Sequence, residues 1–461
     1  MDSKSVYNDI AVAKRIAAEA EKLGGRTYYV GGFVRDSVMA GLPGAAGGIA
    51  AKDIDIEVHG VSYDDLAAIL DSIGHRMTTG ASFGVFGLKG CGLDIALPRS
   101  ETATGRGHRD FKIYVDPFIG EEKAAGRRDF TINAMMQNVL TGEILDFYGG
   151  VEDLKAGIIR HVSSESFPED PLRVFRAAQF AARFGFSVAE ETLDLCSYMD
   201  TDALPRERVF GELEKALIKA ERPSIFFEVM RKIGLSENFF KELVDIIGVP
   251  QDPEYHPEGD VWTHTMLVLD NAALLRRDAE KPLYFMLSAL CHDFGKALVT
   301  GETNGRIHAY EHETAGIETV RTFLHRLTDE NALISYVLNM VRLHMRPNML
   351  VDNNSSFKAY MHLFDEAVVP EDLILLAKAD YMGSLVTASY EPKEAVLREK
   401  LEEFKALMKE PAVKGADLLE AGLKPGPVFR DALDYAHKLH LAGINREEAL
   451  RQTLGYARKR K

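Results

Sequence analysis

The chain has 461 residues, roughly three times the length of a usual domain, so we expect two or three folded units. Its 46% hydrophobic and 27% charged residues are typical of a globular protein and exclude a disordered or fibrous chain. The net charge of −15 disfavours long-range attraction to nucleic acid. A basic stretch that includes Arg106, Arg109 and Lys112 is nevertheless compatible with a local basic surface that binds nucleic acid.

Cysteine usage and hydropathy indicate the cellular compartment of the protein. The 3 cysteines are scattered and odd in number, which argues against a disulfide framework and favours a reducing compartment. No apolar run approaches the roughly 18 residues that a membrane span needs, and the first residues lack the apolar core of a signal peptide. We therefore expect a cytoplasmic protein with no membrane partner.

The first 150 residues alternate between strand-like and helix-like patterns, which predicts a mixed α/β unit. Helical patterns lie at 9–23 and 63–73. The strand-like runs, in chain order, are TYYV, DIDIEV, VFGLKG, LDIAL and ILDFYG. Later helical periods lie at 171–184, 207–220, 262–276, 283–293, 313–327, 333–345, 371–382 and 391–409. Because the strand signal fades beyond residue 150, we expect an α/β head followed by an all-α body.

Two glycines follow the first strand-like run. Gly31 and Gly32 stand between that run and a helical stretch that carries Arg35. Glycines at a strand-to-helix turn let backbone N–H groups approach a polyphosphate closely, and the start of the helix adds a favourable dipole. The pair therefore indicates a phosphate-binding turn, although many glycine pairs are plain turns.

Acidic residues alternate with apolar ones in the second strand-like run. Asp53, Asp55 and Glu57 fall on one face of this strand, and isoleucine and valine fall on the other. Asp94 is a single acid in a later apolar strand. If the two strands are neighbours, the acids form a cluster whose repulsion divalent cations such as Mg²⁺ relieve. The alternative is an edge strand with a solvated acidic face.

Several motifs in this order resemble bacterial-type tRNA nucleotidyltransferases and poly(A) polymerases. The motifs are GGFVRD at 31–36, DID at 53–55, RRDFTINAM at 127–135, EDPLRVFRAAQFAARFGF at 169–186, RERVFGELEKAL at 206–217 and GADLLEAGLKPGP at 415–427. The resemblance spans nearly the whole chain. The chain departs from it at 41–52, where the loop before the acidic strand is longer and richer in glycine than in the family.

The resemblance implies a nucleotidyltransferase head related to polymerase β and assigns roles to the matched residues. Asp53 and Asp55 would hold two Mg²⁺ ions, with Asp94 as the third catalytic acid. The implied nucleotide-binding residues are Gly31, Gly32 and Arg35 for the triphosphate, Arg128, Asp129 and Asn133 for the sugar, and Asp170, Arg173 and Arg176 beyond them.

The acid and the arginine in EDPLR are suited to reading a base. Asp170 and Arg173 are three residues apart and share one face of a helix. A carboxylate only accepts and a guanidinium only donates, so the pair suits the amino group and ring acceptor of cytosine or adenine and rejects uracil and guanine. The alternative is structural, because Asp followed by Pro171 is also an ordinary helix start.

Histidines and aspartates on later helices resemble the HD phosphohydrolase superfamily, an all-α fold that binds a divalent metal. The matching minimal set is His264, His292, Asp293 and Asp380, and the extra ligands of two-metal members are matched by His312 and His344. Nitrogen and oxygen donors without thiolate suit Mn, Ni, Co, Fe or Mg better than a structural zinc. Metal-bound hydroxide would attack a phosphate ester, with Lys296 steadying the charge.

These inferences divide the chain into four parts. We expect a nucleotidyltransferase head at 1–150, a helical neck with the base-reading motif at 151–250, an HD domain at 251–400 and a helical tRNA-binding tail at 401–461. The last helix should begin with a capping box of Asn445 and Glu448.

The resemblance implies a template-independent enzyme that adds C, C and A to tRNA 3′ ends from CTP and ATP, with a phosphohydrolase activity in the HD domain. Its partners would be tRNA and these nucleotides, with no obligatory protein partner. Two alternatives stay open: an A-only enzyme, either tRNA A-adding or poly(A) polymerase, and a phosphohydrolase whose head only binds RNA.

Overall fold

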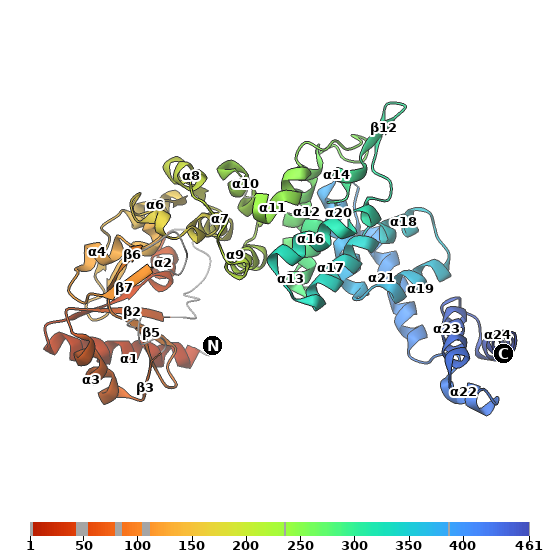
Figure 1. The fold of residues 1–461 in the computed structure, drawn as a ribbon, viewed down its shortest axis with the longest axis horizontal. Coiled ribbons are helices and arrows are strands. Elements are labelled where there is room, and N and C mark those ends of the chain that lie inside the picture. The colour runs from red at the N-terminus through yellow and green to blue at the C-terminus, as the bar shows by residue number, and fades with distance from the viewer. Residues whose placement is uncertain are drawn as a thin grey trace. The chain divides into compact units, whose positions relative to one another are not determined.

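The computed structural model describes residues 3–42, 54–78, 85–103, 111–234, 237–385 and 388–460 (Figure 1). Asp53, nearly all of the glycine-rich loop at 41–52 and residues 104–110 lie outside these residues. The chain forms two compact units, Met1–Ala216 with Ile225–Ser236, and Leu217–Ser224 with Glu237–Lys461. Among the described residues, no helix combines the length and apolar character that crossing a bilayer requires.

The first unit is built on a mixed sheet of seven strands in the order β3-β4-β5-β2-β1-β8-β9. The strands are β1 (Arg26–Val30), β2 (Ile54–His59), β3 (Arg76–Thr78), β4 (Val85–Leu88), β5 (Leu93–Ala96), β8 (Met136–Asn138) and β9 (Ile144–Leu145). The head helices are α1 (Ser3–Lys22), α2 (Gly32–Ala40), α3 (Tyr63–Ile73), α4 (Glu121–Ala125), α5 (Thr131–Ala134) and α6 (Gly150–Ala156). A separate ribbon pairs β6 (Arg99–Ala103) with β7 (Phe111–Val115). The predicted α/β head is confirmed.

The register of the central strands brings the predicted acids together. β2 runs parallel to β5 with Asp55 directly opposite Asp94, and it runs antiparallel to β1 with Asp55 opposite Val30. The apolar residues of β2 are buried, whereas Asp55 and Glu57 are half-buried. The expected alternation and the expected pairing of the two acidic strands are therefore confirmed, and Asp55 sits beside the turn that follows β1.

Helices of the neck complete the first unit. They are η2 (Phe167–Glu169), α7 (Leu172–Phe184), α8 (Glu190–Ser197), α9 (Arg206–Lys219), which crosses the division between the units, and α10 (Ser224–Ile233), with a short parallel pair of β10 (Ile158–Ile159) and β11 (Ser187–Val188). The apolar face of α7 packs Phe180 edge-on against Phe130, which precedes α5, with ring centroids 5.7 Å apart. This contact fixes α7, which carries the predicted base-reading arginine, against the head.

The second unit is helical. Its helices are α11 (Glu237–Asp245), α12 (Val261–Leu275), α13 (Pro282–Cys291), α14 (Lys296–Val299), α15 (His312–Ala315), α16 (Ile317–Leu327), α17 (Asn331–Leu343), α18 (Arg346–Asp352), α19 (Phe357–Glu366), α20 (Pro370–Gly383), α21 (Glu391–Met408), α22 (Gly415–Glu420), α23 (Pro427–Leu441) and α24 (Arg446–Arg458). Asn445 caps α24 by accepting a hydrogen bond from the Glu448 backbone N at 3.1 Å, which is one half of the predicted capping box. The Glu448 carboxylate instead accepts from Arg451 and Gln452.

The prediction of a helical body is confirmed, with one short hairpin inside the second unit. β12 (Gly301–Thr303) and β13 (Arg306–His308) pair through a turn at Asn304 and Gly305, whose φ angles are 53° and 74°. Two consecutive positive φ angles in an Asn-Gly turn match the twist of a hairpin. Each strand has three residues, which is too short for a period-2 pattern to emerge, but the Asn-Gly pair itself was a usable signal.

A close helix crossing positions part of the second unit. α12 and α20 pack so tightly that a Cβ on Gly383 would lie 3.0 Å from the backbone N of Val268. α13 is apolar on all sides, and its residues from Phe285 to Cys291 are buried. These three helices lie together in Figure 1. Because they are locked by packing, polar residues that they carry into the interior are held in defined places.

Candidate active sites

The turn after β1 forms the centre of the candidate site in the head. Gly31 has φ 67°, a left-handed conformation that favours glycine. A Cβ at this position would lie 3.5 Å from Nη1 of Arg128 and 3.6 Å from Oδ2 of Asp55. The carboxylate of Asp55 and the guanidinium of Arg128 therefore converge on the turn, and Asp94 lies on the neighbouring strand. Carboxylate oxygens side by side are donors that suit Mg²⁺.

Arg128 is held by an acid from the face of β2 that carries Asp55. Nη2 of Arg128 lies 3.5 Å from Oε2 of Glu57, whose Oε1 is 2.7 Å from Nε2 of His59. Burial opposes ionisation of Glu57, but the contacts with His59 and Arg128 outweigh it and lower the pKa. Glu57 is therefore a charged anchor for Arg128, a role that the alternation of the strand alone did not indicate.

Four of the predicted nucleotide-binding residues form one hydrogen-bonded chain. Arg35, which is 4% exposed, donates from Nη1 to Oδ1 of Asn133 at 2.7 Å. Asn133 donates from Nδ2 to Oδ1 of Asp129 at 3.0 Å, and Arg176 donates from Nε and Nη2 to Oδ2 of Asp129 at 2.8 and 2.5 Å. Burial opposes ionisation of Asp129, but Arg176 and Asn133 lower its pKa. The network fixes these four side chains next to the turn, because each of them is hydrogen-bonded to another member.

The predicted base-reading pair is close in sequence but is engaged elsewhere. Oδ1 of Asp170 accepts from the backbone N of Leu172 at 3.2 Å, so the structural alternative, a helix-start contact, is observed. Oδ2 accepts from Nη2 of Arg208 at 3.1 Å. Arg173 donates to the carbonyl oxygens of Ser166 and Arg127 at 2.7 and 2.8 Å. Two of the five donors of Arg173 are thus occupied by the backbone.

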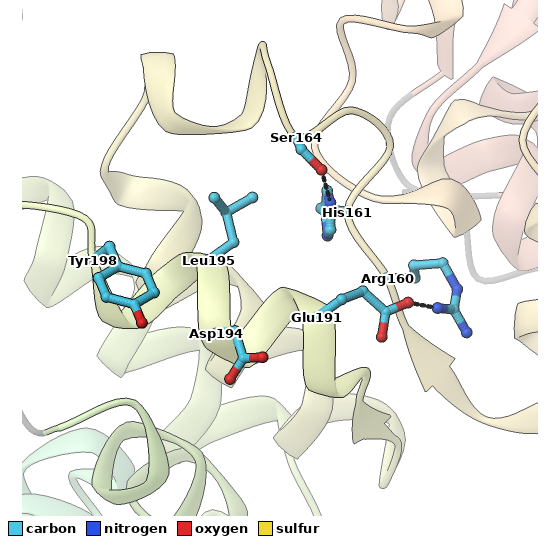
Figure 2. Close-up of a pocket in the computed structure, with 7 residues that line it drawn as sticks. All are labelled: Arg160, His161, Ser164, Glu191, Asp194, Leu195 and Tyr198. Carbon is cyan, nitrogen blue, oxygen red and sulfur yellow. Dashed lines mark hydrogen bonds and ion pairs between the residues drawn. The ribbon is translucent and has the colours of Figure 1, made fainter.

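A cavity of about 410 Å³ opens beside α8 in the first unit. Its lining residues are Arg160, His161, Ser164, Glu191, Asp194, Leu195 and Tyr198. Figure 2 shows His161 directed at Ser164 and Arg160 paired with Glu191. No residue predicted to act on the nucleotide lines this cavity, so it is separate from the site around Gly31.

The second candidate site lies inside the helical unit. The predicted ligands come from separate elements: His264 from α12, His292 and Asp293 from the end of α13, His312 from α15, His344 from the end of α17 and Asp380 from α20. The four histidines and Asp293 are at most 4% exposed, and the side chain of Asp380 is 15% exposed. The structure thus brings all six predicted residues to one buried place.

Asp293 lies between two groups of ligands. Its Oδ2 is 3.2 Å from Nε2 of His292 and 3.6 Å from Nε2 of His264, which is itself 3.0 Å from Oδ1 of Asp380. Its Oδ1 is 3.1 Å from Nε2 of His312 and 3.8 Å from Nε2 of His344. The potential ligand atoms of His264, His292 and Asp293 lie within 4.8 Å of one another, and so do those of Asp293, His312 and His344. This arrangement suits two cations that share one bridging carboxylate.

The second nitrogen of each histidine ring is held by an acceptor. In His292, His312 and His344, Nδ1 donates to the backbone carbonyl three residues earlier, at 2.7 to 2.9 Å. In His264, Nδ1 donates to Oε1 of Glu258 at 2.7 Å. These hydrogen bonds place a proton on Nδ1 and turn Nε2 toward the two aspartates, as metal-ligating histidines require.

The charges of the cluster fit a divalent cation. Burial, together with the neighbouring His312 and His292 rings, lowers the pKa of His344 to about 3, so this imidazole is neutral. Burial also disfavours a charged His264, but Asp380 and Glu258 outweigh it and raise the pKa to about 9. A cation would therefore displace the proton that Nε2 of His264 shares with Asp380.

Asp293 provides the test of fit for a metal. Burial opposes its ionisation, yet His292 and Lys296 hold its pKa well below the usual range. Both carboxylate oxygens have ion-pair contacts, but within the described residues neither has a partner in hydrogen-bond geometry. Lys296 lies beside Oδ2, whereas Oδ1 faces the imidazole nitrogens of His312 and His344, so a cation at that oxygen would stabilise the buried carboxylate further. The nitrogen and oxygen donors therefore fit a divalent metal.

Three residues around this site, Gln251, His256 and Glu258, were not predicted from the sequence. Lys296, 8% exposed, donates from Nζ to Oε1 of Gln251 at 2.7 Å and lies 2.7 Å from Oδ2 of Asp293. Oε1 of Glu258 also lies 2.8 Å from Nδ1 of His256. Gln251, His256 and Glu258 come from an irregular segment without hydrophobic periodicity, so no sequence pattern indicated them.

Replacing Gly295 by Ala should unfold the second unit more easily. A Cβ on Gly295 would overlap the carbonyl oxygen of His312 and lie 2.8 Å from the backbone N of Gly316. Because backbone atoms cannot move aside cheaply, we expect the free energy of unfolding to fall by roughly 3 kcal/mol. Urea unfolding followed by circular dichroism measures this change. Gly455→Ala is the control, since a Cβ there would meet no heavy atom of the described residues within 4 Å outside its own stretch of helix; equal stability of both variants would contradict the packing argument.

The chain matches three known families along its length. Residues 27–160 match the Poly A polymerase head domain, residues 185–247 match the probable RNA and SrmB-binding site of polymerase A, and residues 261–383 match the HD domain. Solved structures with a similar fold include a CCA-adding enzyme in complex with ATP (TM-score 0.64, 20% identity, 98% of this chain and 94% of that one). Another is the CCA-adding enzyme of Thermotoga maritima in complex with tRNA (TM-score 0.62, 21% identity, 99% and 96%).

Relatives with higher identity carry one name. The multifunctional CCA protein of Pasteurella multocida is 39% identical over 316 residues, which cover 67% of this chain and 71% of the relative. The protein of the same name from Haemophilus ducreyi is 35% identical over 371 residues, which cover 78% of this chain and 85% of the relative. With this identity over most of both chains, and with the head and HD families matched in order, the chain belongs to the family of multifunctional CCA proteins.

Proposed function

We propose that this chain adds C, C and A to the 3′ ends of tRNA from CTP and ATP, as a template-independent nucleotidyltransferase. The observation that carries this proposal is the register that sets Asp55 opposite Asp94 beside the turn at Gly31. Its curated relatives are multifunctional CCA proteins, and its fold is that of CCA-adding enzymes solved with ATP, CTP and tRNA. We propose that this reaction takes place in the cytoplasm, as the composition suggests.

The chain's own groups would hold the nucleotide for an in-line transfer. The backbone N–H groups at Gly31 and Gly32, with the start of α2, would receive the triphosphate, and Arg128 would stand beside it. The 3′-oxygen of the tRNA attacks the α-phosphorus, the bond to the bridging oxygen breaks, and pyrophosphate leaves. Two Mg²⁺ ions bound by Asp53 and Asp55, with Asp94 as the third acid, would activate the 3′-hydroxyl and neutralise the leaving group.

The buried network beneath the turn would orient the groups that contact the nucleoside. Arg35, Asn133, Asp129 and Arg176 are linked in one chain of hydrogen bonds, so each side chain has a single arrangement. We propose that this hydrogen-bonded network presents the groups that bind the sugar. The network would also support the base-reading pair, Asp170 and Arg173, at the start of α7. Preorganised polar groups of this kind select a substrate without paying for rearrangement on binding.

Asp170 and Arg173 would select the base. For the pair to read a nucleotide, Oδ2 of Asp170 exchanges its contact with Arg208 for the amino group of cytosine or adenine. Arg173 keeps its two backbone carbonyls and uses remaining N–H groups on the ring acceptor. Uracil and guanine would then leave buried polar groups unpaired, a penalty of roughly 1–3 kcal/mol for each group.

Replacing Asp170 by Asn should relax the choice of nucleotide. The amide can donate to the carbonyl oxygen of uracil or guanine, which the carboxylate rejects. We expect UTP and GTP incorporation, relative to CTP and ATP, to rise by about 10-fold or more, since 1.4 kcal/mol corresponds to a factor of ten. Single-nucleotide extension of a tRNA transcript measures the ratios. Glu165→Gln, an exposed acid five residues earlier, is the control; unchanged ratios in both variants would leave Asp170 as a helix cap.

The helical unit would act as a metal-dependent phosphohydrolase. Divalent metal dependence follows from the HD family and the donor set. We propose Mn, Ni, Co or Mg at His264, His292, Asp293 and Asp380, with His312 and His344 holding a second ion, since these imidazole and carboxylate donors suit such metals. A bound metal would supply a nucleophilic hydroxide. Lys296 would stabilise the charge that develops on the phosphate.

We assign functions to segments on the same basis. The head at 1–150 transfers the nucleotide, the neck at 151–250 reads it, residues 251–400 hydrolyse phosphate esters and the tail at 401–461 contacts tRNA. The tail carries a small apolar cluster of its own, which includes Leu418, Ala432 and Ala449. No obligatory protein partner is needed by either proposed site.

Transcripts that end before the first C, the second C or the A test the main proposal. Each is incubated with Mg²⁺ and with each nucleoside triphosphate singly. We expect CTP to extend the first two and ATP the third. Incorporation of ATP alone would instead indicate an A-only enzyme. No incorporation with any nucleotide would leave a phosphohydrolase with an RNA-binding head.

A further inference from the structure

The segment between the matched families is a closed loop. Residues 248–260 fall after the RNA-binding match, which ends at 247, and before the HD match, which begins at 261. They contain no helix or strand. Their ends are joined, because the backbone N of Val261 donates to the carbonyl of Val249 at 3.0 Å and the backbone N of Gly248 donates to Oδ2 of Asp260 at 2.7 Å. Compact loops closed in this way often carry function.

Two side chains of this loop reach the metal cluster at different points. Glu258 accepts at Oε1 from Nδ1 of His264 at 2.7 Å, and its side chain is 0% exposed. Gln251 contacts Lys296, which lies against Asp293. Glu258 is itself supported by His256, whose Nδ1 lies 2.8 Å from the same Oε1. The loop at 248–260 therefore supplies residues that contact the metal cluster directly, through His264 and Lys296.

The position of His264 explains why it needs a side chain as its acceptor. His292 and His344 directly follow the last residues of α13 and α17, where the carbonyls of the final turn have no partner inside the helix. Those carbonyls accept from Nδ1. His264 lies in the first turns of α12, where the carbonyls are taken by the helix itself. An acceptor for its Nδ1 must come from outside, and Glu258 supplies it.

We propose that Glu258 is a positioning residue of the metal centre, which keeps a proton on Nδ1 of His264 so that Nε2 binds the cation. The proposal rests on the proposed phosphohydrolase site and deepens it. A carboxylate behind a ligating histidine fixes the ring and its tautomer, and loss of such a partner typically weakens metal binding by about 10- to 100-fold.

Binding of Mn²⁺ by full-length variants tests the role of Glu258. All variants carry Asp53→Ala and Asp55→Ala, so that the head does not contribute, and free Mn²⁺ is measured by electron paramagnetic resonance. Glu258→Leu, which removes both acceptor oxygens, should weaken Mn²⁺ binding at the site of His264 by about 10- to 100-fold. Glu258→Gln keeps an acceptor oxygen at the same place and should restore most of the affinity, leaving a loss of about 2- to 5-fold relative to the parent. A purely structural carboxylate would show no such rescue in a folded protein.

Two further variants separate the possible outcomes. Glu254→Gln changes an acid of the same loop that is 61% exposed and pairs with Arg306, and it should bind Mn²⁺ as the parent does. His292→Ala should lose the ion on the Oδ2 side of Asp293, which is the side of His264. If His292→Ala binds normally, the metal centre itself is wrong; if it loses binding while folded Glu258→Leu does not, the role of Glu258 alone is wrong. Should Glu258→Leu fail to fold, Glu258→Gln decides: a small loss supports the proposal, and parental affinity overturns it.

Discussion

Asp55→Asn is expected to abolish nucleotide addition while leaving phosphate-ester hydrolysis intact. The Asp55 carboxylate faces the turn at Gly31 and lies beside Asp94, so its loss removes a charge from the place where the triphosphate would bind. We expect CTP incorporation to fall by about 10³-fold or more, because cation-assisted charge stabilisation supplies several kcal/mol in the transition state. Extension of a tRNA transcript at saturating CTP measures the loss.

An acid on the surface of the same unit provides the control. Asp71, whose side chain is 56% exposed, pairs with Arg76 at 3.0 Å near the end of α3. Surface ion pairs of this kind contribute about 1 kcal/mol or less, so Asp71→Asn should add nucleotides within about 2-fold of the parent. Addition by Asp55→Asn at the parental rate would refute the assignment of the head site, whatever the helical unit does.

Asp293→Asn should remove both metal ions from the helical unit, whereas His344→Ala should remove one. Oδ1 and Oδ2 of Asp293 face different histidine pairs, and His344 belongs to the group on the Oδ1 side. Hydrolysis of bis(p-nitrophenyl) phosphate with Mn²⁺ should fall by about 10³-fold or more in Asp293→Asn, because the charge that holds the cations is lost. Metal analysis by mass spectrometry in the Asp53→Ala/Asp55→Ala background counts the ions.

His437→Ala is the matched control for these variants. Its ring also contacts a carboxylate, Asp365, at 2.9 Å, but on α23 and α19 rather than in the cluster. It should keep the metal content and the hydrolysis rate of the parent. Loss of both ions in His344→Ala would mean that the two groups of ligands do not bind their ions independently. Full metal content in Asp293→Asn would contradict the role of Asp293 as a ligand shared by both groups.

Local periodicity was sufficient for much of the fold and for the acids of the head. Alternation in β2 placed Asp55 on a polar face, and the apolar flanks of Asp94 placed it in a strand, so their proximity followed once the strands were neighbours. The HD ligands were predicted in another way, from the resemblance to the HD superfamily, because periodicity alone does not show that histidines on separate helices meet at one place.

Contacts between distant segments were not predictable in this way. The pairing of Asp170 with Arg208 joins residues 38 positions apart, and that of Glu258 with His264 depends on how an irregular loop closes. Neither loop closure nor the aim of a long side chain leaves a periodic trace in a sequence. The hairpin at 301–308 could be predicted only in part. Its Asn-Gly turn has a clear sequence signal, but its strands are too short to show an alternating pattern.

The carbonyl acceptors of three histidines have a consequence for how the metal centre varies. A main-chain oxygen is present whatever side chain the residue carries, so substitutions at Ala289, Ala309 or Val341 preserve that acceptor as long as the backbone path is kept. The orientation of three imidazoles is thus encoded by the path of the chain and is protected from most single mutations. The orientation of the fourth, His264, depends on the Glu258 side chain, so at the proposed metal site a substitution of that one residue would change the affinity for one ion.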